Sequence, residues 1–189
     1  MTDFVLHLLR HGEPEGAGRL IGHGDAAPLP SGVAACVDRA GGLAVDRLVA
    51  SDLTRACAAA EALSRMNAIP LVVDARWREL DFGAWDGLLM AQVDSDALGR
   101  FWDDPDASPP PGGERWSALQ TRVSAAIAGL PPQTTLVVTH AGAMRAALAL
   151  LCGFDHPRLW AFDLPYAALL TLRVWPGDTP SAQIIGLRT

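Results

Sequence analysis

The sequence predicts a three-layer α/β/α sandwich around a mostly parallel central sheet. Short runs of apolar and β-branched residues alternate with longer Ala- and Leu-rich segments along the chain, which is the pattern of strands covered by helices on both faces. The 189 residues suffice for one domain with its own core. Because no repeat or linker divides the chain, we expect a single domain over 1–189.

The expected elements follow from the hydropathy pattern in chain order. The first strand is a nearly continuous apolar run, typical of a strand buried on both faces, and a Gly- and Pro-rich loop over 12–32 follows it. Ser51 and Asp52 resemble a helix N-cap, and the helix after them is expected to end near Met66. The region 75–88 is too irregular for a regular element. The expected strands are 4–10, 47–51, 71–74, 135–139, 168–174 and 182–187, and the other expected helices are 32–40, 88–101, 114–128 and 142–151.

The composition excludes several classes of function. Fifteen basic residues against 21 acidic ones give a net charge of −6, which disfavours a nucleic-acid partner. All the basic residues are Arg, so no Lys can act as nucleophile or phosphate ligand. No run approaches the roughly 20 apolar residues that span a bilayer, and the N-terminus lacks the features of a signal peptide. The three scattered Cys residues fit a reducing compartment. We therefore expect a cytoplasmic protein without a membrane contact.

Three predicted strand ends carry the polar residues that favour a phosphoryl group. The first strand ends at Arg10, His11 and Gly12, the second is followed by Arg55, and the fourth by His140 and Ala141. The carboxyl ends of parallel strands meet where an open α/β sheet binds its ligand. The helix that begins near Ala141 directs free N–H groups toward an anion, and Arg forms bidentate contacts with phosphate oxygens.

These groups suffice for phosphoryl transfer through a histidine. A neutral imidazole can attack phosphorus, nearby Arg residues lower its pKa, and a second, protonated His can offset charge on the phosphoryl oxygens. The leaving alkoxide needs an acid, for which Glu79, Asp81 and Asp86 remain open at this point. No short metal-ligand spacing and no nucleotide-binding P-loop occur. A single His or Arg taken alone is more often structural; the combination carries the interpretation.

Four ordered blocks resemble the histidine phosphatase superfamily, which includes the cofactor-dependent phosphoglycerate mutases. The blocks are Leu9–Glu13, Ser51–Arg55, Glu79–Gly87 and Val138–Gly142. The resemblance implies that His11 forms a phosphohistidine and that Glu79 is the proton donor. It also implies that Arg10, Arg55, His140 and Ala141 hold the phosphoryl group. No metal or other cofactor is implied.

Within that superfamily the sequence looks most like the α-ribazole phosphatases, which act in cobalamin biosynthesis. The similarity rests on Glu79–Gly87 and on Pro110–Glu114. The resemblance places the loop with Gly22 and His23 on the substrate side. This loop departs from the family pattern, because Pro14–Ala17 contains no Asn and Pro30 replaces a Ser or Thr, and the departures put the substrate in doubt.

Several alternatives stay open at this stage. The expected partner is a small-molecule phosphate ester, but a broad-specificity sugar-phosphate phosphatase, a mutase or a non-enzymatic phosphate-binding module remain alternatives. The oligomeric state, monomer or homodimer, is open. The segment 103–113 is either a mobile lid or a static connection. Trp77, Trp85, Trp102 and Trp116 are expected near the cleft, where core packing is favoured over stacking on a substrate ring.

Overall fold

The structure, a computed structural model, describes residues 2–189 and contains a six-stranded sheet of order β3-β2-β4-β1-β5-β6. The strands β3, β2, β4 and β1 are parallel to one another, whereas β5 pairs antiparallel with β1 and β6 pairs antiparallel with β5. The strands are β1 (Phe4–Arg10), β2 (Arg47–Ala50), β3 (Leu71–Val73), β4 (Thr135–Thr139), β5 (Leu169–Trp175) and β6 (Ser181–Arg188).

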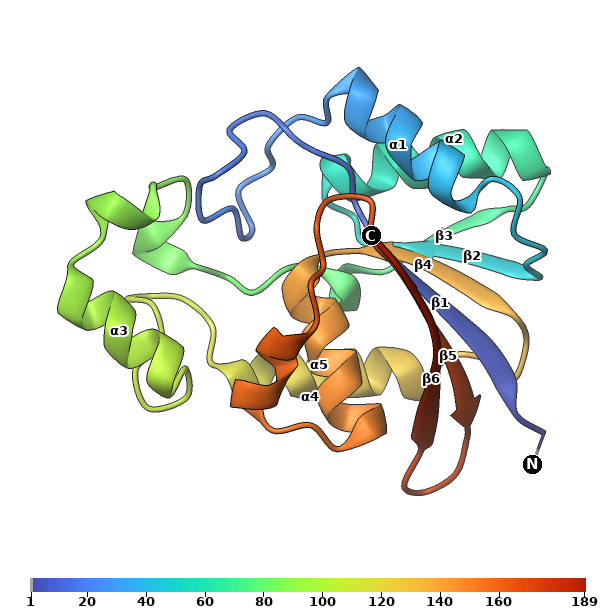
Figure 1. The fold of residues 1–189 in the computed structure, drawn as a ribbon. Helices are drawn as coiled ribbons and strands as arrows, with labels where there is room; N and C mark the ends of the chain where they lie inside the picture. Colours follow the sequence, from blue (N-terminus) through green and yellow to red (C-terminus); the bar gives the residue numbers. More distant parts are fainter. Residues whose placement is uncertain (1) are drawn as a thin grey trace.

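Helices cover both faces of the sheet (Figure 1). The helices α1 and α2 pack together on one face, α4 and α5 pack together on the other, and α3 lies away from the sheet. The sheet's two faces bury different cores: Leu8 and Val137 belong to one cluster, Leu9 and Val138 to the other, as the period of two in a strand requires. The helices are α1 (Pro30–Ala40), α2 (Thr54–Asn67), α3 (Ser95–Asp103), α4 (Trp116–Ala128) and α5 (Ala141–Cys152).

The predicted fold class is confirmed, but the predicted cap of α2 is wrong. Leu53 is the N-cap residue of α2 and makes no side-chain cap. The carboxylate of Asp52 instead binds Arg78 through two hydrogen bonds of 2.8 and 2.5 Å. The first N–H of α2, that of Thr54, donates to Asp25 Oδ1 at 2.7 Å. A distant loop carboxylate therefore replaces the local cap.

The helix predicted over 88–101 is also wrong in its bounds. A single 3₁₀ turn, Met90–Gln92, precedes α3, which begins at Ser95 and ends at Asp103. Asp94 sets this start, because its carboxylate accepts a hydrogen bond from the Ala97 N–H at 2.8 Å, the arrangement of a helix N-cap. The region 75–88 contains only two 3₁₀ turns, Ala75–Trp77 and Gly83–Trp85, in keeping with its predicted irregularity.

The sheet brings the polar strand ends to one edge. Arg10 at the end of β1 pairs with Thr139 at the end of β4, and Ala50 of β2 pairs with Val138. The loop before β5 crosses this edge, where the Ala167 N–H donates to the His11 carbonyl at 3.2 Å.

Of the helices within residues 2–189, none combines the length and apolarity that crossing a bilayer requires.

Candidate active site

His11 and His140 face each other at the ends of β1 and β4. Their ring centroids are 4.9 Å apart with the planes tilted by 59°, and both side chains are buried. His11 Nδ1 lies 2.7 Å from the Gly12 carbonyl oxygen. Because a carbonyl only accepts, Nδ1 carries the proton in the neutral ring and Nε2 keeps its lone pair. His11 therefore has the tautomer that a nucleophile needs.

Burial keeps both imidazoles neutral in the free protein. The pKa of His11 lies well below its ordinary value, first because the ring is desolvated and then because Arg55 and Arg10 are close. Desolvation, His11 and Arg55 lower the pKa of His140 in the same direction. Without an anion beside it, the His140 ring is therefore uncharged at pH 7, and the expected proton on His140 stays a prediction for the state with a bound phosphoryl group.

Arg10 and Arg55 both lie close to the two imidazoles. The Arg10 guanidinium stacks 4.1 Å from the ring centroid of Tyr166 and donates to the Leu164 carbonyl at 2.6 Å. Arg55 is 1% exposed and donates through its two Nη atoms to loop carbonyls at 2.6 and 2.9 Å. Backbone carbonyl oxygens therefore hold both guanidiniums in place.

Unpartnered donors concentrate around His11. Within residues 2–189, seven buried side-chain nitrogen atoms lack a hydrogen-bond partner, and four of them are Arg10 Nε, Arg55 Nε and the two ring nitrogens of His140. Buried polar groups without partners are costly and rare. An anion bound here would give Arg10 Nε, Arg55 Nε and the N–H of His140 the acceptor that the protein does not supply.

Backbone N–H groups hold the Glu79 carboxylate beside the histidines and arginines described above. Its Oε1 accepts from the Leu80 N–H at 2.9 Å and its Oε2 from the Gly142 N–H at 3.1 Å. The Glu79 carbonyl accepts from Arg122 Nη2 at 2.7 Å and from His23 Nε2 at 3.0 Å. The carboxyl group therefore has a fixed position beside the N-terminus of α5.

The other two candidate acids have structural contacts. Asp86 accepts hydrogen bonds from the N–H groups of Gly22 and Gly24 at 3.0 and 2.5 Å. Asp81 accepts from the Gly83 N–H at 2.9 Å and lies 3.6 Å from His23 Nδ1. Neither lines the cavity at His11, so the geometry favours Glu79 as the acid.

A cavity of about 150 Å³ opens onto the nucleophile. We call it the phosphoryl cavity. Arg55 and His140 are not among its lining residues. Gly22 and His23 contact Arg55 and Glu79 rather than line it. Ala141 lines the neighbouring cavity on the far side of Glu79. The residues that line the phosphoryl cavity are Arg10, His11, Pro14, Arg19, Leu20, Ile21, Glu79, Phe82 and Tyr166.

Sequence reasoning missed three residues that shape this site. Arg19 and Tyr166 line the phosphoryl cavity, and the Tyr166 ring lies 5.6 Å from that of His11. Arg122 joins the carbonyls of 76, 78 and 79 while its guanidinium binds both carboxylate oxygens of Glu114 at 2.8 Å. None of these three residues belongs to a block that resembles the family. Only Glu114, the partner of Arg122, belongs to such a block, Pro110–Glu114.

The four Trp residues expected near the cleft divide into two groups. Trp77 and Trp85 belong to the core, 0% and 8% exposed, as core packing predicted. Trp102 and Trp116 line the cavity next to Glu79 instead.

The nearby segment 110–114 is hydrogen-bonded to the acid block Glu79–Gly87, since the Glu114 N–H donates to the Asp81 carbonyl at 2.9 Å. This bond attaches Glu114, the residue after the segment 103–113, to the acid block.

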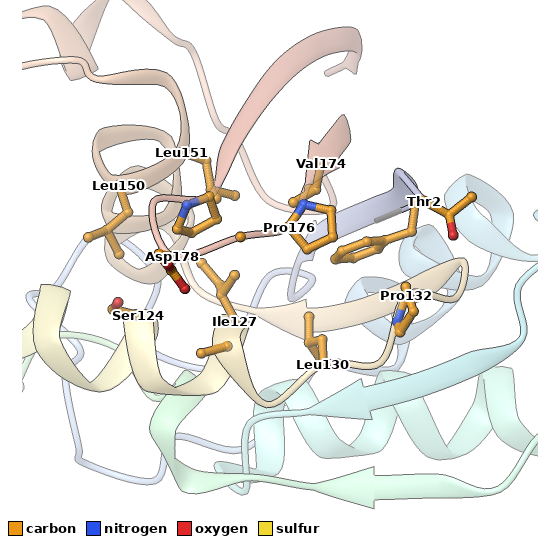
Figure 2. Close-up of a pocket in the computed structure, with 14 residues that line it drawn as sticks. Thr2, Ser124, Ile127, Leu130, Pro132, Leu150, Leu151, Val174, Pro176 and Asp178 are labelled. Atoms are coloured by element: carbon orange, nitrogen blue, oxygen red, sulfur yellow. The ribbon is translucent and has the colours of Figure 1, made fainter.

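A larger cavity, of about 430 Å³, lies at the opposite end of β1 (Figure 2). Its walls are mostly apolar and include Phe4, Ile127 and Val174, and its one charged side chain is Asp178. A phosphate ester would meet a carboxylate there and no cation. The lining of the smaller phosphoryl cavity, with Arg10 and Arg19, fits a phosphate ester better. No cluster of His, Cys, Asp and Glu with the arrangement of a metal site occurs in residues 2–189.

Comparison with known proteins identifies the family. The sequence profile of the histidine phosphatase superfamily (branch 1) matches residues 6–184. A glucosyl-3-phosphoglycerate phosphatase of Mycolicibacterium vanbaalenii is 31% identical over 78% of this chain and 74% of its own. A bifunctional protein of Mycobacterium tuberculosis is 31% identical over 97% of this chain and 54% of its own. The chain thus spans about half the length of that relative.

Solved structures share the fold over nearly the whole chain. A mycobacterial glucosyl-3-phosphoglycerate phosphatase superposes with a TM-score of 0.83 at 26% identity, covering 97% of this chain and 98% of its own. A putative α-ribazole-5′-phosphate phosphatase from Escherichia coli has a TM-score of 0.85 at 23% identity, covering 100% and 97%. At that identity the second likeness concerns the fold alone.

Proposed function

Because the chain belongs to the histidine phosphatase superfamily (branch 1), we propose that it is a phosphomonoesterase that hydrolyses a small-molecule phosphate ester through a phosphohistidine. The observation that carries the proposal is the set of unpartnered buried donors on Arg10, Arg55 and His140 around a neutral His11. These donors match the oxygens of a phosphoryl group, and the charge of that group would favour a proton on His140.

The reaction has two steps. In the first, His11 Nε2 attacks phosphorus, the bond between phosphorus and the alcohol oxygen breaks, and the Glu79 carboxyl group gives its proton to the leaving oxygen. In the second, Glu79 takes a proton from water, the resulting hydroxide attacks phosphorus, and the P–N bond breaks to release phosphate. Arg10, Arg55 and His140 stabilise the charge on the phosphoryl oxygens throughout.

Two substrate classes have support. The Glu79–Gly87 and Pro110–Glu114 blocks support α-ribazole 5′-phosphate and a place in cobalamin biosynthesis, whereas the likeness to the glucosyl-3-phosphoglycerate phosphatase supports a sugar phosphate. A kinetic panel of both esters with 3-phosphoglycerate separates these classes, and an isomerised product instead of free phosphate would reveal a mutase. The free thiols of the three Cys residues support action in the reducing cytoplasm.

Trapping an acid-labile phosphoenzyme tests the proposed chemistry. Rapid quench with labelled p-nitrophenyl phosphate should yield one phosphohistidine, and His11→Ala should abolish it while lowering kcat by about a thousandfold or more. His7→Gln is the matched control, because His7 lies on the same strand and bonds to Thr171 away from the site. Excess EDTA should leave both readouts unchanged. A phosphoenzyme that survives in His11→Ala would contradict the assignment.

A further inference from the structure

A second cavity adjoins the phosphoryl cavity on the far side of Glu79. It has a volume of about 140 Å³ and is lined almost entirely by apolar atoms. We call it the aromatic chamber. Its ring-bearing walls come from four separate segments: the loop residue Phe82, the end of α3, the start of α4 and the 3₁₀ helix His156–Ala161. The residues that define it here are Phe82, Trp102, Trp116, Arg145, His156 and Trp160.

The rings of the chamber support one another edge to face. Trp102 and Trp160 have ring centroids 5.0 Å apart at an interplanar angle of 86°, and Trp116 and His156 are 5.4 Å apart at 71°. Such tilted pairs are the preferred geometry of aromatic rings. The walls therefore present flat, apolar faces whose positions are set before a ligand arrives.

Arg145 is the one cation that lines the chamber. Its guanidinium carbon lies 4.2 Å from the ring centroid of Trp160, and it donates one long hydrogen bond of 3.3 Å to the Phe162 carbonyl. Its buried Nε has no partner within residues 2–189. Because a guanidinium has five N–H donors, Arg145 retains donors for an acceptor on a ligand.

The chamber and the phosphoryl cavity share two lining residues, Glu79 and Phe82. The acid therefore lies between the compartment for the phosphoryl group and the aromatic one. An alcohol oxygen that receives its proton from Glu79 places its substituent at the mouth of the chamber.

We propose that the aromatic chamber binds the alcohol part of the substrate, and that this part carries one flat, largely apolar ring with a hydrogen-bond acceptor toward Arg145. The proposal rests on the phosphatase function proposed above and adds its substrate class. The ring lies on the chamber side of the ester oxygen, because Glu79 itself borders the chamber.

The volume of the chamber limits the size of this ring. A cavity of about 150 Å³ holds one benzene molecule, so 140 Å³ suits a single six-membered ring. A larger group would extend outward across Trp102 and Trp160, which also line a shallow groove on the surface. A sugar ring of the same size would lose water from hydroxyl groups that the apolar walls cannot bond, which is unfavourable.

Three simple esters of primary alcohols test the inference on the whole protein. Benzyl phosphate carries the flat ring, glucose 6-phosphate a hydroxylated ring, and ethyl phosphate no ring. We expect kcat/KM for benzyl phosphate to exceed those of the other two about tenfold or more. Benzyl alcohol should likewise inhibit the wild-type protein competitively at about one-tenth of the concentration that ethanol requires, a measurement that needs no variant.

Substitutions then locate the effect. Trp116→Ala should remove most of the preference for benzyl over ethyl phosphate, whereas Trp175→Ala, which changes a Trp on β5 that is 42% exposed, should leave it unchanged. A carboxylate on the benzyl ring should improve kcat/KM in the wild type and give no improvement in Arg145→Met. Circular dichroism and the urea-unfolding midpoint show that each variant is folded.

The two proposals fail in different ways. Equal kcat/KM for benzyl and ethyl phosphate, or a higher value for glucose 6-phosphate, overturns the ring assignment while a trapped phosphohistidine keeps the phosphatase function. Absence of a phosphoenzyme with every ester overturns both.

Discussion

At the scale of single residues, the position of the acid depends on an absent side chain. Gly142 has no positive φ, so its backbone does not require glycine. A Cβ atom on Gly142 would, however, collide with Glu79 Oε1, the carboxyl group whose other oxygen accepts the Gly142 N–H. Glycine is needed here for space, because the helix N-terminus and the acid approach so closely.

Gly142→Ala should therefore displace the acid and leave the nucleophile in place. We expect kcat for ethyl phosphate, whose leaving group needs a proton, to fall about tenfold or more, and kcat for p-nitrophenyl phosphate to change little. Glu79→Gln should show the same selectivity and is the benchmark. Gly99→Ala is the matched control, since a Cβ on Gly99 meets nothing within 4 Å. Equal slowing with both esters would remove Glu79 from the acid role.

At the scale of elements, the loop before α1 and the start of α2 are bound to each other. Asp25 accepts hydrogen bonds from the Thr54 N–H and hydroxyl at 2.7 and 2.8 Å. One residue later, Arg55 donates to the Gly22 and Gly24 carbonyls. The helix thus obtains its cap from the loop, and the loop obtains its shape from the helix.

Asp25→Ala should loosen this connection. The loss of a helix cap costs about 1 kcal/mol of unfolding free energy, and the freed loop should weaken the binding of inorganic phosphate because Arg55 loses its fixed orientation. Urea unfolding and calorimetric titration with phosphate measure the two effects. Asp38→Ala on α1 is the control, because Asp38 is exposed. Wild-type values for both quantities in Asp25→Ala would show that the cap is irrelevant.

Local sequence signals predicted the strands well and the contacts between elements poorly. The apolar runs at 4–10 and 135–139 coincide with β1 and β4, and their parallel pairing brings His11 and His140 together, as the strand ends predicted. The cap of α2 could not be predicted, because Arg78 takes the Asp52 carboxylate from 26 positions away. Tyr166 and Arg122 carry no motif, and only the folded chain brings them to the site.

At the scale of the whole molecule, the charge of the site is opposite in sign to the net charge of the protein. The protein carries a net charge of −6, yet Arg10 and Arg55 lie beside His11 and His140 where β1 and β4 end. Exposed charges more than about 8 Å away are largely screened at physiological salt, so the buried cations decide what binds. This site has a cost for the fold, because burial first, and the nearby arginines after it, lower the pKa values of both histidines.

The pH dependence of stability should reveal that cost. The folded-state pKa values of His11 and His140 lie below their ordinary value, so the unfolded chain binds protons first as the pH falls below about 6.5. The unfolding free energy should therefore decrease with falling pH, by at most about 1.4 kcal/mol per pH unit for each histidine, until the folded form is protonated too.

His140→Gln removes one of these two groups and should make the dependence shallower. Urea unfolding at pH 7.5, 6.5 and 5.5 gives the slope, which is independent of any constant loss of stability in the variant. Saturating inorganic phosphate should flatten the wild-type slope as well, because its negative charge beside the imidazoles raises their pKa values toward the unfolded ones. A slope in His140→Gln as steep as that of the wild type would mean that His140 is not held neutral by the folded protein.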